Sequence, residues 1–426
     1  MLRPNEHAFV FLSWTSIALP IADILSTNSP LTLLLPVYDL DLTEKWDGKT
    51  ALGEPSRWAW LPNTDDPPSG FSDWYEPKQT HYSSALDPLN QTNFEGDLLP
   101  SLRGKLGDVN IRHVVIILLE STRQDVFPFK KDGYMWKKLE ETWDNQTIPT
   151  DVRERLATLT KTANFITGDY NDGFDHPETR RRGGIHAIHG TPSATYTLKS
   201  CAGTLCGISP LAVDGNQEYY SHIYQPCLPH IFKLFNDMDH ASTHSPINRQ
   251  YTGYRFRVPL AFSHPNLPTI EIQESVTAMS VVPTILDLLI ETGSFSSSEL
   301  QAARDLLRNY EGQSLIRSLK APETASEQRW QFTAVSPGGQ GVSVRSMDEP
   351  RWRLVVPLIE DLEWWFSDLD TDPHEEDPTG SFGFAKLLQT VEEKHGIEAA
   401  KWAEEAAFVT RWWVTENHER WRYNPE

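Results

Sequence analysis

The segment HVVIILLESTRQDVFP, residues 113–128, begins as an unbroken apolar run and ends in a cluster of polar side chains. A short run rich in Val and Ile predicts a buried strand. In open α/β sheets, ligands bind beyond the carboxyl ends of the strands, so Glu120, Ser121 and Thr122 are expected at a functional edge. A carboxylate there suits a divalent cation; the alternative is that Glu120 caps the next helix.

Composition limits the classes of function. The chain has 426 residues, 39% of them hydrophobic, with 15 Trp, 18 Phe and 13 Tyr, which is enough for one large core or two smaller ones. Its 59 acidic and 38 basic residues give a net charge of −21, so we expect no nucleic-acid partner. Cys201, Cys206 and Cys227 lack zinc-finger spacing; they allow one disulfide and leave at least one further thiol.

The amino-terminal segment bears on the compartment. Residues 8–22, AFVFLSWTSIALPIA, are apolar enough for a signal-peptide core but short for a membrane span. Two Asn-x-Thr sequons begin at Asn90 and Asn145 and make these residues glycosylation candidates. We therefore expect the secretory pathway or a membrane, and the sequence leaves membrane association open.

Three zones follow one another along the chain. Residues 1–108 hold the apolar leader and an extended arm rich in Pro, Ser, Asp and Asn. Residues 109–320 alternate strand-like and helical runs, which predicts an α/β domain with a mainly parallel sheet flanked by helices. Residues 321–426 hold two short strand candidates, QFTAVS and RWRLVVPL, and a Trp-rich helix near 383–417.

Several segments, in this order, resemble the sulfatase branch of the alkaline phosphatase-like superfamily. HVVIILLES resembles its first strand and first metal acid, in the Glu variant of lipoteichoic acid synthase-like proteins. The other similar segments are TLKSCAGTLCGISP (197–210), RFRVPLAFSHP (255–265), SVVPTILDLL (280–289), YEGQSLIRSL (310–319) and EWWFSDLDTDPHEED (363–377). The resemblance implies a metal-dependent hydrolase or transferase acting on sulfate or phosphate esters, with a small anionic ester or a lipid or glycan head group as substrate.

The nucleophile follows from the same resemblance. In the family the reacting residue lies ten positions before a Gly and three before a Ser, a relation that selects Thr197 from Gly207 and Ser200. Sulfatases carry Cys/Ser-x-Pro-x-Arg there, so the threonine argues against formylglycine and is similar to phosphotransferase members. Lys199 would neutralise an oxygen of the transferring group. The alternatives are Thr195 as nucleophile, and Thr197 as a helix N-cap without catalytic role.

The resemblance also implies one divalent cation, manganese, magnesium, calcium or zinc, held by Glu120, Thr197, Asp239 and His240. The family's Asp-His pair is usually followed by Gly, where this chain has Ala241. Only 42 positions separate Thr197 from Asp239, whereas family members carry a longer stretch with several strands. A catalytically inactive, shortened protein, or an incomplete gene model, is therefore the alternative to an active enzyme.

Two further clusters have simpler interpretations. His176, His186 and His189 lie beside three arginines, and we interpret residues 175–190 as a mobile loop that at most guides an anionic substrate. The aromatic residues of the carboxyl-terminal helix recur at helical intervals, which favours packing against the domain over stacking on a sugar. These residues are Trp402, Phe408, Trp412, Trp413 and Trp421.

Overall fold

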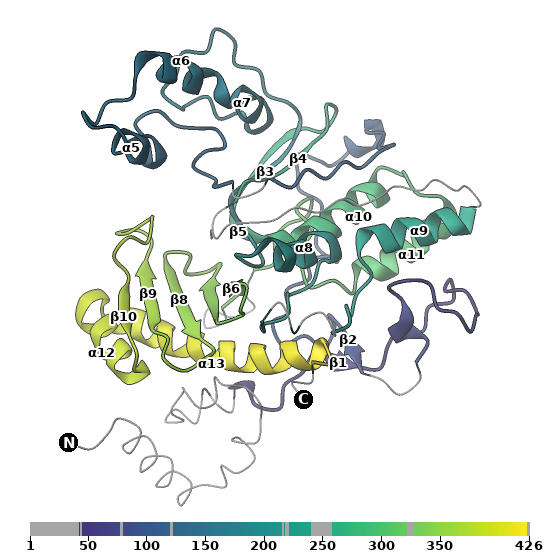
Figure 1. Ribbon diagram of the computed structural model, residues 1–426. Coiled ribbons are helices and arrows are strands. Elements are labelled where there is room, and N and C mark those ends of the chain that lie inside the picture. Colours follow the sequence, from purple (N-terminus) through teal and green to yellow (C-terminus); the bar gives the residue numbers. More distant parts are fainter. Residues whose placement is uncertain are drawn as a thin grey trace, which may run out of the picture.

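The computed structural model describes residues 42, 45–76, 80–119, 122–214, 217, 221–239, 258–321 and 328–423. Within these ranges the chain is a mixed α/β protein with two main sheets, both joined to long helices (Figure 1). The predicted α/β class is therefore confirmed. The parts of residues 45–108 that the structure describes form an arm of loops with two short strands, β1 (Leu52–Gly53) and β2 (His81–Tyr82), and two 3₁₀ turns, η1 (Ser72–Trp74) and η2 (Leu106–Asp108).

The first sheet has three strands in the order β4-β3-β5, which are β3 (Gly184–Thr191), β4 (Leu260–Ser263) and β5 (Thr269–Thr277). β3 pairs in parallel with β5 and antiparallel with β4. The helices that accompany it are α8 (Thr197–Cys206), α9 (Leu228–Asp239), α10 (Val281–Glu291), preceded by the turn η4 (Ala278–Ser280), and α11 (Ser297–Leu307). The segment SVVPTILDLL lies almost wholly in helix α10, whose residues 281–290 are all buried.

The second sheet is an antiparallel meander of five strands in the order β10-β9-β8-β7-β6. Its strands are β6 (Trp330–Val335), β7 (Gly341–Ser346), β8 (Trp352–Pro357), β9 (Trp364–Asp368) and β10 (Thr379–Ser381). β6 and β8 confirm the two strands predicted from QFTAVS and RWRLVVPL. A mainly parallel sheet is not shown, because β3–β5 is the one parallel strand pair among the described strands.

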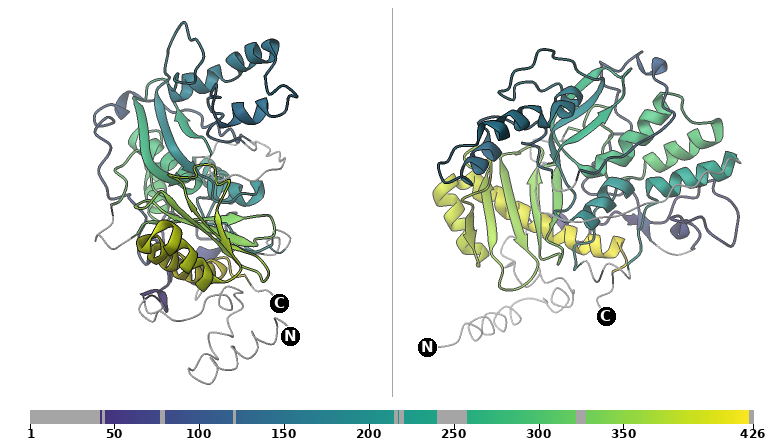
Figure 2. Two further views of the ribbon diagram at one scale, coloured as in Figure 1. Left: turned by 90° about the vertical axis from the view of Figure 1, so that its left-hand side faces the viewer. Right: turned by 45° about the horizontal axis from the view of Figure 1, so that its top comes forward.

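The Trp-rich carboxyl-terminal segment forms two helices, α12 (Phe384–His395) and α13 (Ile397–Arg420), separated at Gly396. Helix α13 crosses one face of the five-stranded sheet and continues past β6 towards α8 (Figures 1 and 2). Trp402, Phe408, Trp412 and Trp413 are buried in the shared core, so the packing interpretation of the aromatic residues is confirmed. Trp421 is also buried, in the neighbouring cluster around the loop after α8.

A separate group of helices lies between residues 122 and 182, namely α5 (Tyr134–Glu140), α6 (Thr150–Leu159) and α7 (Lys161–Thr167). It lies at the top left of Figure 1 and has a small core of its own around Phe129, Trp136 and Ile148. Its helix α5 contacts the connection between β9 and β10, where Tyr134 stacks on His374 with ring centroids 3.9 Å apart (Figure 2). α6 and α7 follow each other directly and are separated at Thr160.

The strand predicted at residues 113–119 is wrong for the described structure. These residues are in no strand, and no backbone hydrogen bond joins them to another segment of the described chain. Val115 is 78% exposed and Ile117 76% exposed, whereas Ile116 packs against the core cluster that includes Leu260 and Phe262 of β4. The apolar composition alone does not make a strand, because a strand also needs a neighbour that satisfies its backbone groups.

We expect Trp413→Ala to lower the free energy of unfolding by about 3–5 kcal/mol, because the indole is 2% exposed and stacks on Phe332 with ring centroids 4.7 Å apart. Equilibrium unfolding in urea measures the change. The matched control is Trp365→Ala, which removes a ring that is 46% exposed, and should cost less than about 1 kcal/mol. Equal losses in the two variants would contradict the packing described for α13.

Candidate functional site

The candidate site lies at the carboxyl end of the parallel pair β3–β5, where the chain turns from β3 into α8. Edge strand β6 fixes the connecting loop: the Ala334 amide donates to the Ser193 carbonyl (3.0 Å), and the Thr195 amide donates to the Ala334 carbonyl (2.9 Å). The Thr333 hydroxyl donates to the Pro192 carbonyl (2.9 Å). The turn that precedes the candidate nucleophile is therefore held by the second sheet.

Thr197 is the first residue of α8 and its side chain is half-buried. Helix α8 runs from Thr197 to Cys206 and ends at Gly207, which adopts the left-handed conformation (φ 62°) common at helix ends. A Cβ at Gly207 would lie 2.8 Å from a ring atom of Tyr310, so glycine is also required for space. The ten-residue spacing between Thr197 and Gly207 therefore corresponds to the length of one helix.

Thr195, the alternative nucleophile, is buried, and its hydroxyl oxygen accepts a hydrogen bond from the Ser336 amide (3.0 Å). This contact ties Thr195 to the loop after β6. Of the two threonines, the half-buried Thr197 at the helix start is the better placed to meet a ligand.

Lys199 is 1% exposed, and its ammonium group donates to the carbonyls of Leu211 (2.7 Å) and Val213 (2.6 Å). A lysine this deeply buried needs such oxygen partners to offset the loss of hydration. Neutralisation of a transferring group by Lys199 stays a prediction. It would require the ammonium to give up a hydrogen bond to at least one of these carbonyls and to bind the ligand instead.

The other predicted metal ligands cannot be compared with the structure. Glu120 and His240 lie outside the described residues, and Asp239 ends α9 with a side chain that is also outside the description. Among the side chains that are described, no group of three or more His, Cys, Asp or Glu could hold a metal ion. A threonine hydroxyl does not make a metal site by itself, so the cation stays a prediction.

Arg345 is a buried residue beside the site that the sequence interpretation missed. It lies on β7, a strand buried along its whole length, and its guanidinium donates to the Thr191 hydroxyl (3.3 Å) and to the Ser275 hydroxyl. It thereby joins the ends of β3 and β5 to the second sheet. One arginine within the strand-like run GVSVRS could have indicated this contact. A guanidinium that is buried in a strand needs oxygen partners on neighbouring segments.

The histidines predicted to lie in a mobile loop have a different environment, and that interpretation is wrong for two of them. His186 and His189 belong to β3, and only His176 precedes the strand, where its Nε2 lies 2.8 Å from Asp172 Oδ1. Within the described part of the chain the Nε2 of His186 has no hydrogen-bond partner. Burial lowers the pKa of His186 and Arg181 acts in the same direction, whereas Glu271 raises it.

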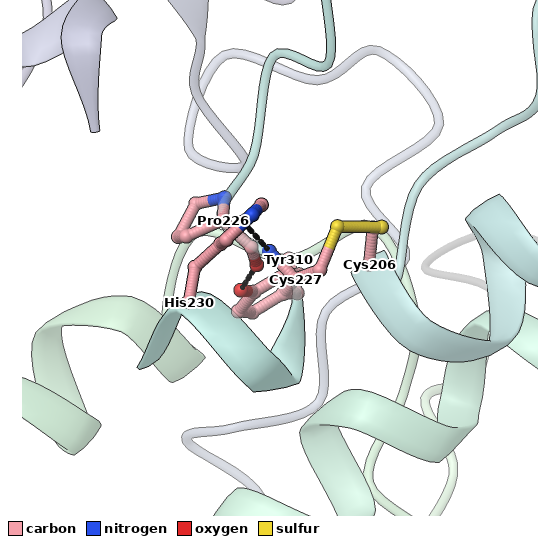
Figure 3. Close-up of a disulfide and its surroundings, with 5 residues drawn as sticks. All are labelled: Cys206, Pro226, Cys227, His230 and Tyr310. Carbon is pink, nitrogen blue, oxygen red and sulfur yellow. Dashed lines mark hydrogen bonds between the residues drawn. A yellow bond between two sulfur atoms is a disulfide. The ribbon is translucent and has the colours of Figure 1, made fainter. Parts of the chain in front are cut away.

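The disulfide Cys206–Cys227 joins the end of α8 to the start of α9 and leaves Cys201 outside it. Figure 3 shows this bridge beside Tyr310, whose hydroxyl donates to the Pro226 carbonyl. The Cys227 amide donates to Nδ1 of His230 (3.1 Å). Both ends of the segment between α8 and α9 are thus fixed close to each other.

The two glycosylation candidates are exposed. Asn145 lies in a turn in which its side-chain oxygen accepts from the Thr147 amide (3.1 Å). Asn90 has a left-handed backbone (φ 46°), and its side-chain oxygen accepts from the Lys320 ammonium. Their modification stays a prediction. None of the helices in the described ranges is long and apolar enough to cross a membrane.

No protein-family model matches this chain, and a search of curated proteins finds no match either.

The burial of His186 predicts a pH dependence of stability. Its folded-state pKa is lowered, so below pH ~6.5 the unfolded chain takes up a proton that the folded chain does not. The free energy of unfolding should therefore fall as the pH drops from 7.5 to 5. In His186→Gln the fall should be smaller, by at most about 1.4 kcal/mol per pH unit. Urea unfolding at a series of pH values measures it.

The matched control is His113→Gln, which removes an exposed imidazole and should leave the pH dependence of the wild type unchanged. If the pH profile of His186→Gln coincided with that of the wild type, burial of this imidazole would not contribute to acid sensitivity.

Proposed function

We propose that this chain is a sulfatase-like, metal-dependent hydrolase or transferase that acts on sulfate or phosphate esters. The observation that supports it best is the placement of Thr197, the candidate nucleophile, as the first residue of a helix that begins just beyond the carboxyl end of a buried strand. The amides and the dipole at a helix amino terminus favour negative charge, which both a sulfate and a phosphate ester carry.

In this proposal Thr197 attacks the ester, and Glu120, Thr197, Asp239 and His240 hold one divalent cation. When bound, such a cation supplies positive charge that favours deprotonation of a neighbouring hydroxyl, which is otherwise a weak nucleophile at neutral pH. The mainly parallel sheet of the sulfatase-like core belongs to the same proposal, with β3–β5 as its parallel part. A small anionic ester, or a lipid or glycan head group, in the secretory pathway or at a membrane, is the substrate class.

We expect Thr197→Ala to abolish turnover of an aryl phosphate or aryl sulfate ester while changing stability by only about 1 kcal/mol, because Thr197 is half-buried and is the first residue of α8, whose N-cap is Tyr196. Steady-state assays with each of the four candidate cations, together with urea unfolding, measure both quantities. If Thr197→Ala kept its activity while Thr195→Ala or Thr122→Ala lost it, the nucleophile would be misassigned.

Metal content tests the cation separately. We expect about one divalent ion per chain in the wild type and substantially less in Glu120→Ala, as measured by mass spectrometry of the purified protein. If the metal content were near zero in both proteins, the catalytic proposal would be contradicted, regardless of the activity of Thr197→Ala.

The second candidate function is a catalytically inactive, shortened relative, and one observation favours it. Residues 114–119 are six consecutive apolar side chains, a pattern typical of a strand covered on both faces, yet five of them are large, exposed side chains. The described chain supplies them with neither a strand partner nor a covering layer. A stretch missing between Gly207 and Asp239 would explain this exposure.

Sequencing the transcript across the junction from Phe235 to His240 separates the two candidates. If the sequence here derives from an incomplete gene model, we expect an additional strand-rich segment in the message, and the full-length protein should then be the one assayed. A transcript that matches the present sequence, combined with no turnover under any of the cations, would instead support the inactive protein.

A further inference from the structure

The segment that follows α8, residues 208–213, is buried along its whole length although it is neither helix nor strand. Its carbonyl groups therefore cannot be satisfied by regular secondary structure or by bulk water. Side chains bind five consecutive carbonyls instead. The contacts are Trp421 Nε1 to Ser209 (2.8 Å), Asn417 Nδ2 to Pro210 (3.2 Å), Lys199 Nζ to Leu211 (2.7 Å), His418 Nε2 to Ala212 (3.4 Å) and Lys199 Nζ to Val213 (2.6 Å).

These donors come from two helices that are distant in the sequence. The last turns of α13 supply Asn417 and His418, and Trp421 directly follows that helix, whereas Lys199 belongs to the first turn of α8. Asn417 also accepts a hydrogen bond from the Ala212 amide (3.0 Å), so its carboxamide binds the loop through both ends. Like Lys199, Asn417 is 1% exposed.

The loop is anchored at its start as well. Gly207 follows the disulfide cysteine Cys206, and the Ser209 hydroxyl donates to Glu311 (2.6 Å). Glu311 in turn pairs with Arg420 of α13 at 3.1 Å. The loop therefore contacts α13 at several points. Lys199 binds the loop from the first turn of α8, so the position of the loop also determines the position of that turn.

We propose that the end of α13 acts as a latch that positions the first turn of α8 through the loop 208–213, with Lys199 as the positioning residue. A buried carbonyl without a donor is strongly disfavoured, so the loop is stable only when both helices contribute their donors. Lys199 lies two residues after Thr197, so the latch also sets the direction of the candidate nucleophile; this last step rests on the proposed function.

Cys201 provides a probe of the latch that needs no activity. It lies on α8, is half-buried, and is the one thiol outside the disulfide. In Asn417→Ala the Ala212 amide and the Pro210 carbonyl lose their partner, so α8 should open more often. We expect alkylation of Cys201 by iodoacetamide, under native conditions, to be faster than in the wild type by about tenfold or more. Trp421→Phe, which removes one donor and keeps most of the ring, should give a smaller increase of about threefold.

The matched control is Asn164→Ala. Asn164 is also a buried asparagine whose Nδ2 makes two hydrogen bonds, to Asp169 (2.8 Å) and Asp172 (2.7 Å), but it lies on α7, away from the latch. Asn164→Ala should leave the alkylation rate of Cys201 at the wild-type value, although it also destabilises the protein. Equal rates in Asn417→Ala, Trp421→Phe and wild type would overturn the latch.

Variants of Lys199 distinguish positioning from direct contact with substrate. Lys199→Met should raise the alkylation rate of Cys201 and lower turnover, and Lys199→Arg, which restores donors, should recover both in part. If Lys199→Met lowered turnover with an unchanged alkylation rate, Lys199 would contact the substrate, and the latch would be overturned. If the wild type showed no turnover but the variants still changed the alkylation rate of Cys201 as described, the proposed function would be contradicted and the latch would be supported.

Discussion

The buried carbonyls of residues 209–213 are the constraint on which much of this structure depends. Each buried polar group without a partner costs about 1–3 kcal/mol, a large fraction of the stability of a typical domain. The chain meets this cost with donors from α8 and α13, whose sequence positions differ by about two hundred residues. These contacts therefore hold the end of α13, the loop 208–213 and the first turn of α8 in one arrangement.

A buried ionic cluster reinforces this arrangement. Arg420 of α13 lies 3.1 Å from Glu311 and 3.7 Å from Asp87 of the arm, and its Nε lies 3.3 Å from Glu416. Burial raises the pKa of Glu311, while Arg420 lowers it. Removing the Arg420 guanidinium would leave these buried carboxylates without the cation that the described chain places beside them, which is far costlier than losing an exposed ion pair. The cluster explains why the arm, although poor in regular structure, is ordered where it contacts α13.

Hydrophobic periodicity correctly predicted elements that pack against segments near them in the sequence or that have a clear apolar face. The strands at 331–336 and 351–358 and the aromatic face of the last helix followed from periodicity, because each strand pairs with the next strand along the chain and the helix has a clear apolar face. The strand at 113–119 and the loop at 175–190 failed for a different reason. Strand formation depends on a distant partner: β4 and β5 make His186 and His189 part of a strand, whereas no described segment pairs with residues 113–119.

The residues of the candidate site also fall into those that a local pattern predicts and those that depend on distant segments. The segment TLKSCAGTLCGISP predicts Thr197 as a candidate, but the partners of Lys199 and Arg345 depend on the approach of distant segments that no motif describes.

The loop 208–213 and the segment 113–119 differ in how far their groups find partners. In the loop 208–213 every carbonyl from residue 209 to residue 213 has a donor, even at the expense of burying a lysine and an asparagine. In the segment 113–119 a row of Val, Ile and Leu is left exposed, although burying each such side chain would stabilise the protein by about 1.5–3 kcal/mol. Other buried polar atoms of the described chain, such as Nε2 of His186 and Nε1 of Trp74, have no such partner. Within the described part of the chain, distant donors thus specify the hydrogen bonding of the loop, whereas the apolar run 113–119 has no strand partner.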